Sequence, residues 1–244
     1  MDFVSGQILL VDKPLKWTSF DVVKRIRGVL TRRHGVKRFK VGHAGTLDPL
    51  ATGVMLICTG RSTKLIDQLQ AGEKEYVATV RFGATTPSFD LETAVDATYP
   101  TDGLTAEAVE AVLGRFRGPQ MQVPPVFSAV KIDGKRAYKM ARKGEAPELK
   151  AKPIVISELE LLNFDPRSCE ARLRVACSKG TYIRSLARDL GDALGCGAHL
   201  TALRRTRVGS ASIYDCADVR SLIDLLKEIE IEIPDENQNN IKKQ

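Results

Sequence analysis

The residues best suited to chemistry lie in the segment 41–60, VGHAGTLDPLATGVMLICTG, where four glycines surround one histidine, His43, and one aspartate, Asp48. Glycine permits tight turns that a ligand can approach closely. Pro49 follows Asp48 and favours an extended backbone there. The Asp48 carboxylate could act as a nucleophile, or it could only stabilise an Asx-type turn, which is the simpler interpretation of this residue taken alone. The segment is neither a Walker loop nor a GxGxxG dinucleotide site.

Hydrophobic patterning predicts the elements that must position this segment. Strands are expected at 7–12, 53–59, 75–82 and 170–178, with alternating apolar residues in the last two. Helices are expected to begin at Ser19, at Ser62 or Thr63, at Thr105 (closed by Gly118), and just after 180–181. Half-buried strands with intervening helices predict an α+β fold, in which helices flank a central, mainly antiparallel sheet.

The charge of the chain is unevenly distributed. Its 244 residues include 37 Lys+Arg and 30 Asp+Glu, for a net charge of +7. Residues 209–244 carry 8 acidic and 4 basic side chains, so residues 1–208 have a net charge of +11. Eight of the basic residues lie in 24–40, without an acid, and eight more lie in 131–152. Such segments favour an anionic partner, of which nucleic acid is the commonest.

Composition excludes several classes of protein. No apolar run approaches the roughly 18 residues of a membrane span, and the N-terminus does not have the pattern of a signal peptide. The five cysteines form no CxxC pair, and the three histidines are far apart. The sequence therefore predicts no zinc site and favours reduced thiols in a cytoplasmic protein.

Several ordered segments share a family resemblance. GHAGTLDPLATGV is preceded by DKP and followed by KEY, and then come VPPVFSAVKIDGKRAYKMARKGE, CSKGTYIRSLARDLG and CGAHLTALRRTRVG. In this order, over roughly residues 5–215, they resemble the TruB family of bacterial tRNA pseudouridine-55 synthases. The long glycine-rich motif with its companions is far more specific than any short motif alone.

The resemblance implies a pseudouridine synthase fold and an isomerase that acts on uridine in the T loop of tRNA. The target base is flipped out of the RNA, detached from its sugar at N1 and rejoined through C5, without a metal or an organic cofactor. Asp48 matches the catalytic aspartate of GTLDP. Whether it attacks the sugar or the base, or first abstracts a sugar proton, is left open.

The resemblance also assigns roles around Asp48. His43 fills the gap left by the flipped base, Tyr76 stacks on that base, and Arg184 forms an ion pair with Asp48. Tyr182 lines the uridine pocket, and Leu203 forms its apolar floor. Without the resemblance, Tyr76 and Leu203 would be interpreted as core residues and Arg184 as a surface residue.

The expected organisation is a catalytic domain over 1–215, with an inserted, mobile RNA-binding arm at about 120–152. The acidic segment 216–244 is too short for an ordinary separate domain, so no full PUA domain is expected. Instead, a short helix should pack through Leu222, Leu225, Leu226 and Ile229. Residues 24–40, the arm and Arg204, Arg205 and Arg207 are expected to contact tRNA phosphates. We expect a cytoplasmic monomer.

Two other functions remain open on the sequence alone. A non-catalytic RNA-binding or tRNA-chaperone module would use the same basic segments. A synthase of the same fold could also act on another RNA.

Overall fold

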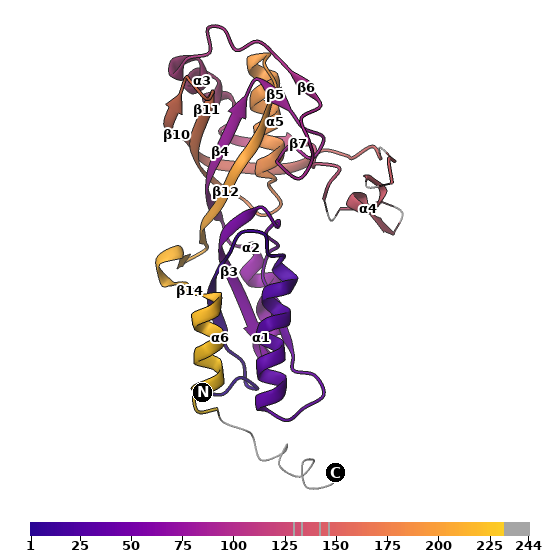
Figure 1. Ribbon diagram of the computed structural model, residues 1–244, viewed down its shortest axis with the longest axis vertical. Helices are drawn as coiled ribbons and strands as arrows, with labels where there is room; N and C mark the ends of the chain where they lie inside the picture. Colours follow the sequence, from indigo (N-terminus) through magenta and orange to yellow (C-terminus); the bar gives the residue numbers. More distant parts are fainter. Residues whose placement is uncertain (129, 133, 142, 146, 232–244) are drawn as a thin grey trace. The chain divides into compact units, whose positions relative to one another are not determined.

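The computed structural model describes residues 1–128, 130–132, 134–141, 143–145 and 147–231. The chain forms two compact units (Figure 1). Unit 1 consists of Met1–Glu73 and the chain from Arg204 onward, and unit 2 is Lys74–Leu203. The predicted catalytic domain, 1–215, therefore comprises one whole unit and most of the other.

Unit 1 is built on a small mixed sheet. β1 pairs antiparallel with β3 and parallel with β14, β2 pairs antiparallel with β3, and β12 pairs with β13. Its strands are β1 (Ile8–Lys13), β2 (Val41–His43), β3 (Ala51–Thr59), the end of β12 (Ala198–Val208), β13 (Ala211–Ser212) and β14 (Ala217–Asp218). Its helices are α1 (Ser19–Arg33), η1 (Gly60–Leu65), α2 (Ile66–Ala71), η3 (Ile213–Asp215) and α6 (Val219–Glu228).

Helix α1 has the predicted apolar stripe, because Val22, Val23, Ile26, Val29 and Leu30 are all buried. Its N-cap is Thr18, which forms a capping box with Asp21, so the predicted cap at Ser19 is wrong by one residue. The Ser19 hydroxyl instead bonds to the backbone of Leu47. The expected helix at Ser62 or Thr63 also begins differently, since a 3₁₀ turn starts at Gly60 and α2 follows from Ile66.

The predicted C-terminal helix is α6, which lies beside α1 (Figure 1). Leu222 and Leu226 are buried as expected, whereas Leu225 is 53% exposed and does not pack. The Arg33 guanidinium donates hydrogen bonds to the carbonyls of Leu226, Lys227 and Ile229. These groups lie at the helix end, where carbonyls lack helical partners. Residues 232–244, part of the predicted acidic segment, lie outside the described residues.

Unit 2 contains an antiparallel sheet in the order β4, β11, β10, β7. These strands are β4 (Lys74–Phe82), β11 (Glu170–Cys177), β10 (Lys152–Asp165) and β7 (Gly118–Gln122). The predicted alternation of β4 is confirmed, since Tyr76, Ala78, Val80 and Phe82 are buried. The unit also contains β5 (Ala84–Thr85), β6 (Ala97–Thr98), α3 (Ala106–Leu113), η2 (Gly114–Phe116) and α5 (Ile183–Leu194). The α+β class with a mainly antiparallel sheet is thus confirmed.

Helix α3 begins at its predicted cap, Thr105, but ends at Leu113. Gly118, which was expected to close it, begins β7. The arm contains a short hairpin, β8 (Lys131–Ile132) with β9 (Lys135–Arg136), followed by α4 (Ala137–Ala141) (Figure 1). Its mobility stays a prediction. Among the described residues, no helix is long and apolar enough to cross a bilayer.

Gly53 is a glycine that the packing of unit 1 requires. Its φ is +108°, and a Cβ there would lie 2.1 Å from the carbonyl oxygen of Arg205 on β12. We expect Gly53→Ala to lower the free energy of unfolding by about 3 kcal/mol or more, because strain and backbone overlap add. Urea unfolding of the purified variant measures this.

Gly209→Ala is the matched control, since Gly209 has a φ of +56° but open space around its missing Cβ. Strain alone should then cost about 1 kcal/mol. Equal losses in the two variants would contradict the close approach of β12 to Gly53.

Candidate active site

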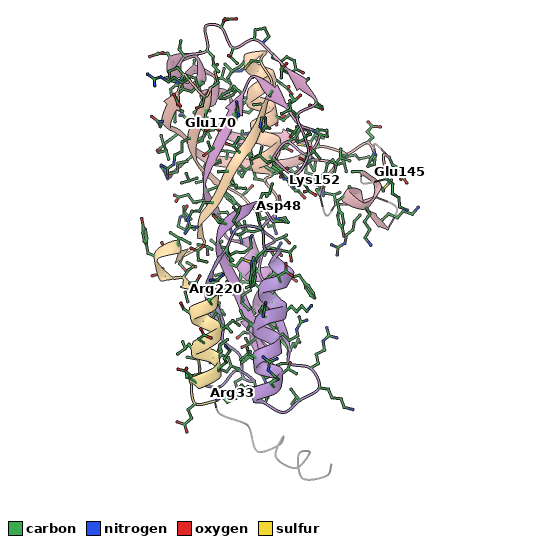
Figure 2. The ribbon with its side chains drawn as sticks, viewed as in Figure 1. Arg33, Asp48, Glu145, Lys152, Glu170 and Arg220 are labelled. Carbon is green, nitrogen blue, oxygen red and sulfur yellow. The ribbon has the colours of Figure 1, made fainter. Side chains whose placement is uncertain are left out.

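Asp48 lies in the glycine-rich loop that joins β2 to β3. Gly45 has a φ of +97°, which turns the chain sharply after His43. The Ala44 amide donates to the Leu56 carbonyl in the second half of β3, and the amide of Ala51, the first residue of β3, donates to the Asp48 carbonyl, so both ends of the loop are bonded to this strand. Figure 2 shows Asp48 and Arg33 at opposite ends of unit 1, with Asp48 near the beginning of α1.

The beginning of α1 holds one side of this loop. The Ser19 hydroxyl accepts a hydrogen bond from the Leu47 amide at 2.8 Å and donates to the Leu47 carbonyl at 3.0 Å. The Lys16 amide donates to the Pro49 carbonyl at 2.8 Å. The residues on both sides of Asp48 are therefore bonded to the segment that starts α1.

Arg205 holds the other side of the loop from within the core. Its side chain is 1% exposed. The guanidinium donates to the carbonyls of Val54 at 2.8 Å, Gly45 at 3.2 Å and Thr46 at 3.4 Å. The expectation that Arg205 contacts phosphate is therefore wrong, because its donors face buried backbone. The basic pattern of the sequence could not distinguish a buried arginine from an exposed one.

The neighbouring arginines of β12 have acidic partners. Arg204 forms a bidentate pair with Asp12, at 2.7 and 3.2 Å, and Arg207 lies 2.9 Å from Glu73. Both guanidinium groups remain partly exposed. Contact of either arginine with phosphate stays a prediction.

Lys13, to which sequence reasoning gave no role, is fully buried at the end of β1. Its ammonium donates to the carbonyls of Pro14 at 3.0 Å and Trp17 at 2.6 Å. Burial lowers the pKa of Lys13 to about 8, and the nearby Asp48 carboxylate opposes that shift. The pair favours a charged Lys13 and an ionised Asp48 at neutral pH. The only sequence signal was the DKP element within the resemblance.

His43 ends β2 just before the loop. Burial lowers the pKa of its imidazole, and the positive charge of Arg205 lowers it further. A neutral ring at neutral pH is compatible with stacking rather than with a cationic role. In the described part of the chain, no group of three or more His, Cys, Asp or Glu side chains could hold a metal ion.

In unit 2, Arg184 projects from the first turn of α5 and is 5% exposed. Its guanidinium donates to the carbonyls of Ser88 at 3.2 Å and Phe127 at 2.9 Å, and its Nε lies 3.6 Å from a carboxylate oxygen of Asp90. Arg184 is thus a buried, oriented arginine and not a surface residue. Asp90 lies in the loop 84–93 of the family resemblance, but its partner was not predicted, because nothing in the spacing showed that this loop meets α5.

The remaining candidates of unit 2 lie on different elements. Tyr76 is on the buried face of β4, paired with Val175 of β11. Tyr182 is the N-cap of α5, and the Gln122 side chain accepts from its amide at 2.8 Å and donates to its carbonyl at 3.1 Å. Leu203 is a partly buried residue of β12.

Asp48, His43 and Lys13 all belong to unit 1, and the charges of Lys13 and Asp48 are close enough to interact. Arg184, by contrast, belongs to unit 2. The ion pair between Arg184 and Asp48 therefore stays a prediction, as do the substrate contacts of Tyr76, Tyr182 and Leu203.

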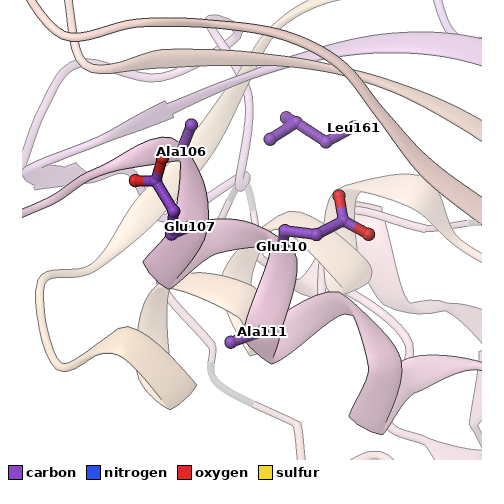
Figure 3. Close-up of a pocket in the computed structure, with 5 residues that line it drawn as sticks. All are labelled: Ala106, Glu107, Glu110, Ala111 and Leu161. Carbon is purple, nitrogen blue, oxygen red and sulfur yellow. The ribbon is translucent and has the colours of Figure 1, made fainter.

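A surface hollow of unit 2 contains none of these residues. It is lined by Ala106, Glu107, Glu110, Ala111 and Leu161, where α3 lies beside β10 (Figure 3). Its two glutamates have the wrong charge for an RNA phosphate, so it is a poor candidate for an RNA-binding site.

Known proteins resemble this chain over nearly its whole length. Residues 32–183 match the family model "TruB family pseudouridylate synthase (N terminal domain)", and residues 184–238 match "tRNA pseudouridylate synthase B C-terminal domain". tRNA pseudouridine synthase B of Phocaeicola vulgatus is 60% identical, over 95% of this chain and 98% of that protein. The enzyme of the same name from Parabacteroides distasonis is 57% identical, over 97% and 100%. Similarity thus continues past residue 215, into the acidic segment.

Among solved structures, a Cbf5–Nop10–Gar1 complex contains a chain with a TM-score of 0.67 and 28% identity. The match covers 94% of this chain but only 58% of the Cbf5-complex chain. It supports the predicted fold of this chain.

The Arg205 contacts lead to a stability prediction. Arg205→Lys keeps the charge but loses the planar fork, which removes the guanidinium donors from the carbonyls of Gly45 and Thr46. We expect the free energy of unfolding to fall by about 2–3 kcal/mol, measured by urea unfolding. Arg204→Lys, the adjacent partly exposed control, should cost less than about 1 kcal/mol. If Arg205→Lys lowers the free energy of unfolding no more than Arg204→Lys does, the proposed role of Arg205 in holding the Asp48 loop is contradicted.

Proposed function

Since the chain belongs to the TruB family of pseudouridylate synthases, we propose that it converts uridine 55 in the T loop of tRNA to pseudouridine, with Asp48 as the nucleophile. The observation that carries this proposal is the placement of Asp48. Its carboxylate stands on a loop bonded on one side to Ser19 and Lys16 and on the other to Arg205, next to the ammonium of Lys13. Such a fixed, ionised carboxylate is what nucleophilic catalysis requires.

The reaction breaks the bond between N1 of the base and C1′ of the ribose and forms a bond between C5 and C1′. The proton on C5 leaves, and N1 gains one, so the product is an isomer of the substrate. The base must first leave the RNA stack. In the proposed mechanism Asp48 forms the transient bond, to the sugar or to the base, and the neutral ring of His43 stacks where the flipped base had been. Tyr76 stacks on the target base.

Arg184 is proposed as the cation that pairs with Asp48 during the reaction. Two carbonyls and the Asp90 carboxylate already fix its guanidinium plane. Asp90 is therefore proposed as a positioning residue, which acts on Asp48 only through Arg184. Tyr182 and Leu203 complete the proposed uridine pocket.

Exposed basic side chains support RNA as the partner. Within 24–40 the exposed basic residues are Lys24, Arg25, Arg32, Lys37, Arg38 and Lys40. In this proposal these residues and the protein's arm at about 120–152 bind phosphates in the T arm of tRNA. Such contacts predict strongly salt-dependent binding. The proposal also includes action as a monomer in the cytoplasm, without a cofactor.

The first test is Asp48→Asn, which keeps the shape of the side chain but removes its negative charge. We expect pseudouridine formation on a T-arm stem-loop to fall below detection, while RNA affinity changes by less than about threefold. Asp67→Asn, at an exposed site on α2, is the matched control.

Turnover like that of wild type in Asp48→Asn would refute the assignment. RNA binding by the wild type without any modified uridine would instead identify a binding module. Mapping the modified position in cellular RNA would identify a synthase with another target.

The second test is Arg184→Lys, which keeps a charge but loses the fork that Asp90 and the two carbonyls orient. We expect kcat to fall by at least about tenfold, measured in single-turnover assays on the same stem-loop. Arg188→Lys, one turn later on α5, is the control and should retain turnover. Unchanged kinetics in Arg184→Lys would show that Arg184 does not pair with Asp48.

A further inference from the structure

The beginning of α1 exposes several large apolar side chains. Phe20 is 58% exposed and Leu15 is 51% exposed, and Trp17 between them is partly exposed. In a chain with only 6% aromatic residues, two such rings at one helix end are unusual. Exposed aromatic residues of this kind are common where a protein binds a partner.

Arginines lie over both rings. The guanidinium carbon of Arg25 is 5.8 Å from the centre of the Trp17 ring, and that of Arg27 is 5.8 Å from the centre of the Phe20 ring. Arg27 is held in place by a hydrogen bond from its Nη2 to the Val41 carbonyl at 2.8 Å. Both pairs lie within cation–π distance, so the surface combines flat rings with positive charge.

This surface is joined directly to the Asp48 loop. The Lys16 amide donates to Pro49, and the Ser19 hydroxyl bonds to Leu47, so the residues that flank Trp17 and Phe20 contact those that flank Asp48. All of them belong to unit 1. A molecule that presents a group to Asp48 therefore passes close to these rings.

Gly28 gives an independent indication on the same helix. It lies in the interior of α1, where glycine costs about 1 kcal/mol relative to alanine. A Cβ there would meet only the end of the Arg32 side chain, at 3.9 Å, so packing within the protein does not require glycine. Lys24 and Arg32 lie one turn before and one turn after it. The bare backbone leaves space for another chain to approach between these cations.

We propose that Trp17, Phe20, Arg25 and Arg27 form an RNA-contact surface, on which an unpaired nucleobase near the target uridine stacks. Lys24 and Arg25 take the adjoining phosphates, and the ribose–phosphate backbone passes over Gly28. Stacked bases and salt-dependent phosphate contacts are the usual chemistry of single-stranded RNA recognition. The proposal rests on the proposed function, because it needs RNA at Asp48.

Trp17 is the only tryptophan of the chain, so its fluorescence reports on this surface alone. The Asp48→Asn protein, which should bind without turnover, is titrated with a T-arm stem-loop, and filter binding is measured in parallel. We expect saturable quenching of Trp17 and protection from acrylamide, at the same RNA concentration as binding. A blunt duplex of equal charge should quench much less.

RNA binding without a change in Trp17 emission would refute the proposed RNA-contact surface but leave the proposed function intact. Absence of RNA binding altogether would overturn both. Quenching by anionic lipid vesicles but not by RNA would identify a membrane surface and refute the proposal.

Variants separate stacking from folding. Phe20→Ala should weaken stem-loop binding and raise KM by about tenfold, with little change in kcat or in thermal stability. Leu225→Ala, at an exposed apolar site on α6, is the control and should change neither. Gly28→Ala should raise the melting temperature and yet lower RNA affinity. Wild-type affinity in both Phe20→Ala and Gly28→Ala would overturn the proposal.

Discussion

The buried guanidinium of Arg205 is the interaction on which the candidate site depends. A buried charge is tolerated only when its donors are satisfied, and here backbone carbonyls of Gly45, Thr46 and Val54 satisfy them. The loop must therefore turn its carbonyls inward, which the φ of +97° at Gly45 allows. β12 must also approach β3 closely, which only a glycine at position 53 permits. With its backbone fixed in this way, the loop presents the Asp48 side chain in a defined position.

Some basic side chains of this chain bond to its own backbone, and others are exposed and available to a partner. Arg205 and Lys13 bond to backbone carbonyls within the core, and Arg33 caps the end of α6. Arg27 is fixed to β2, although its ring contact keeps it near the surface. Net charge therefore overstates the charge that faces RNA. The basic run 24–40 still presents six exposed cations, of which only Lys24 and Arg25 lie in the first half of α1.

Elements with a strong local pattern could be predicted from the sequence. The alternation in β4 and β11 and the apolar stripe of α1 depend only on neighbours in the chain, so periodicity revealed them. The resemblance supplied Asp48. The partners of Arg205 and Asp90 could not be predicted because they are distant in the sequence: Arg205 bonds to residues 151 to 160 positions away, and Asp90 meets a helix that begins at Ile183. Lys13 bonds to carbonyls only one and four residues away, but no sequence pattern showed that its ammonium is buried. A sequence shows that these residues can carry charge, but burial and topology decide whether that charge faces a ligand or the core.

Lys13 indicates that the site is maintained at the expense of stability. Its folded pKa of about 8 is below its ordinary value of 10.5. Between these values the unfolded chain binds more protons than the folded chain, so this group makes the protein more stable as the pH rises from about 8 to 10.5. Below pH 8 the full cost of burying the charged ammonium remains. A neutral side chain would avoid that cost but would leave the Pro14 and Trp17 carbonyls without this donor and would remove a cation that interacts with Asp48. The burial of a lysine here is therefore better explained by the ionisation of Asp48 and the shape of the turn before α1 than by the stability of the core.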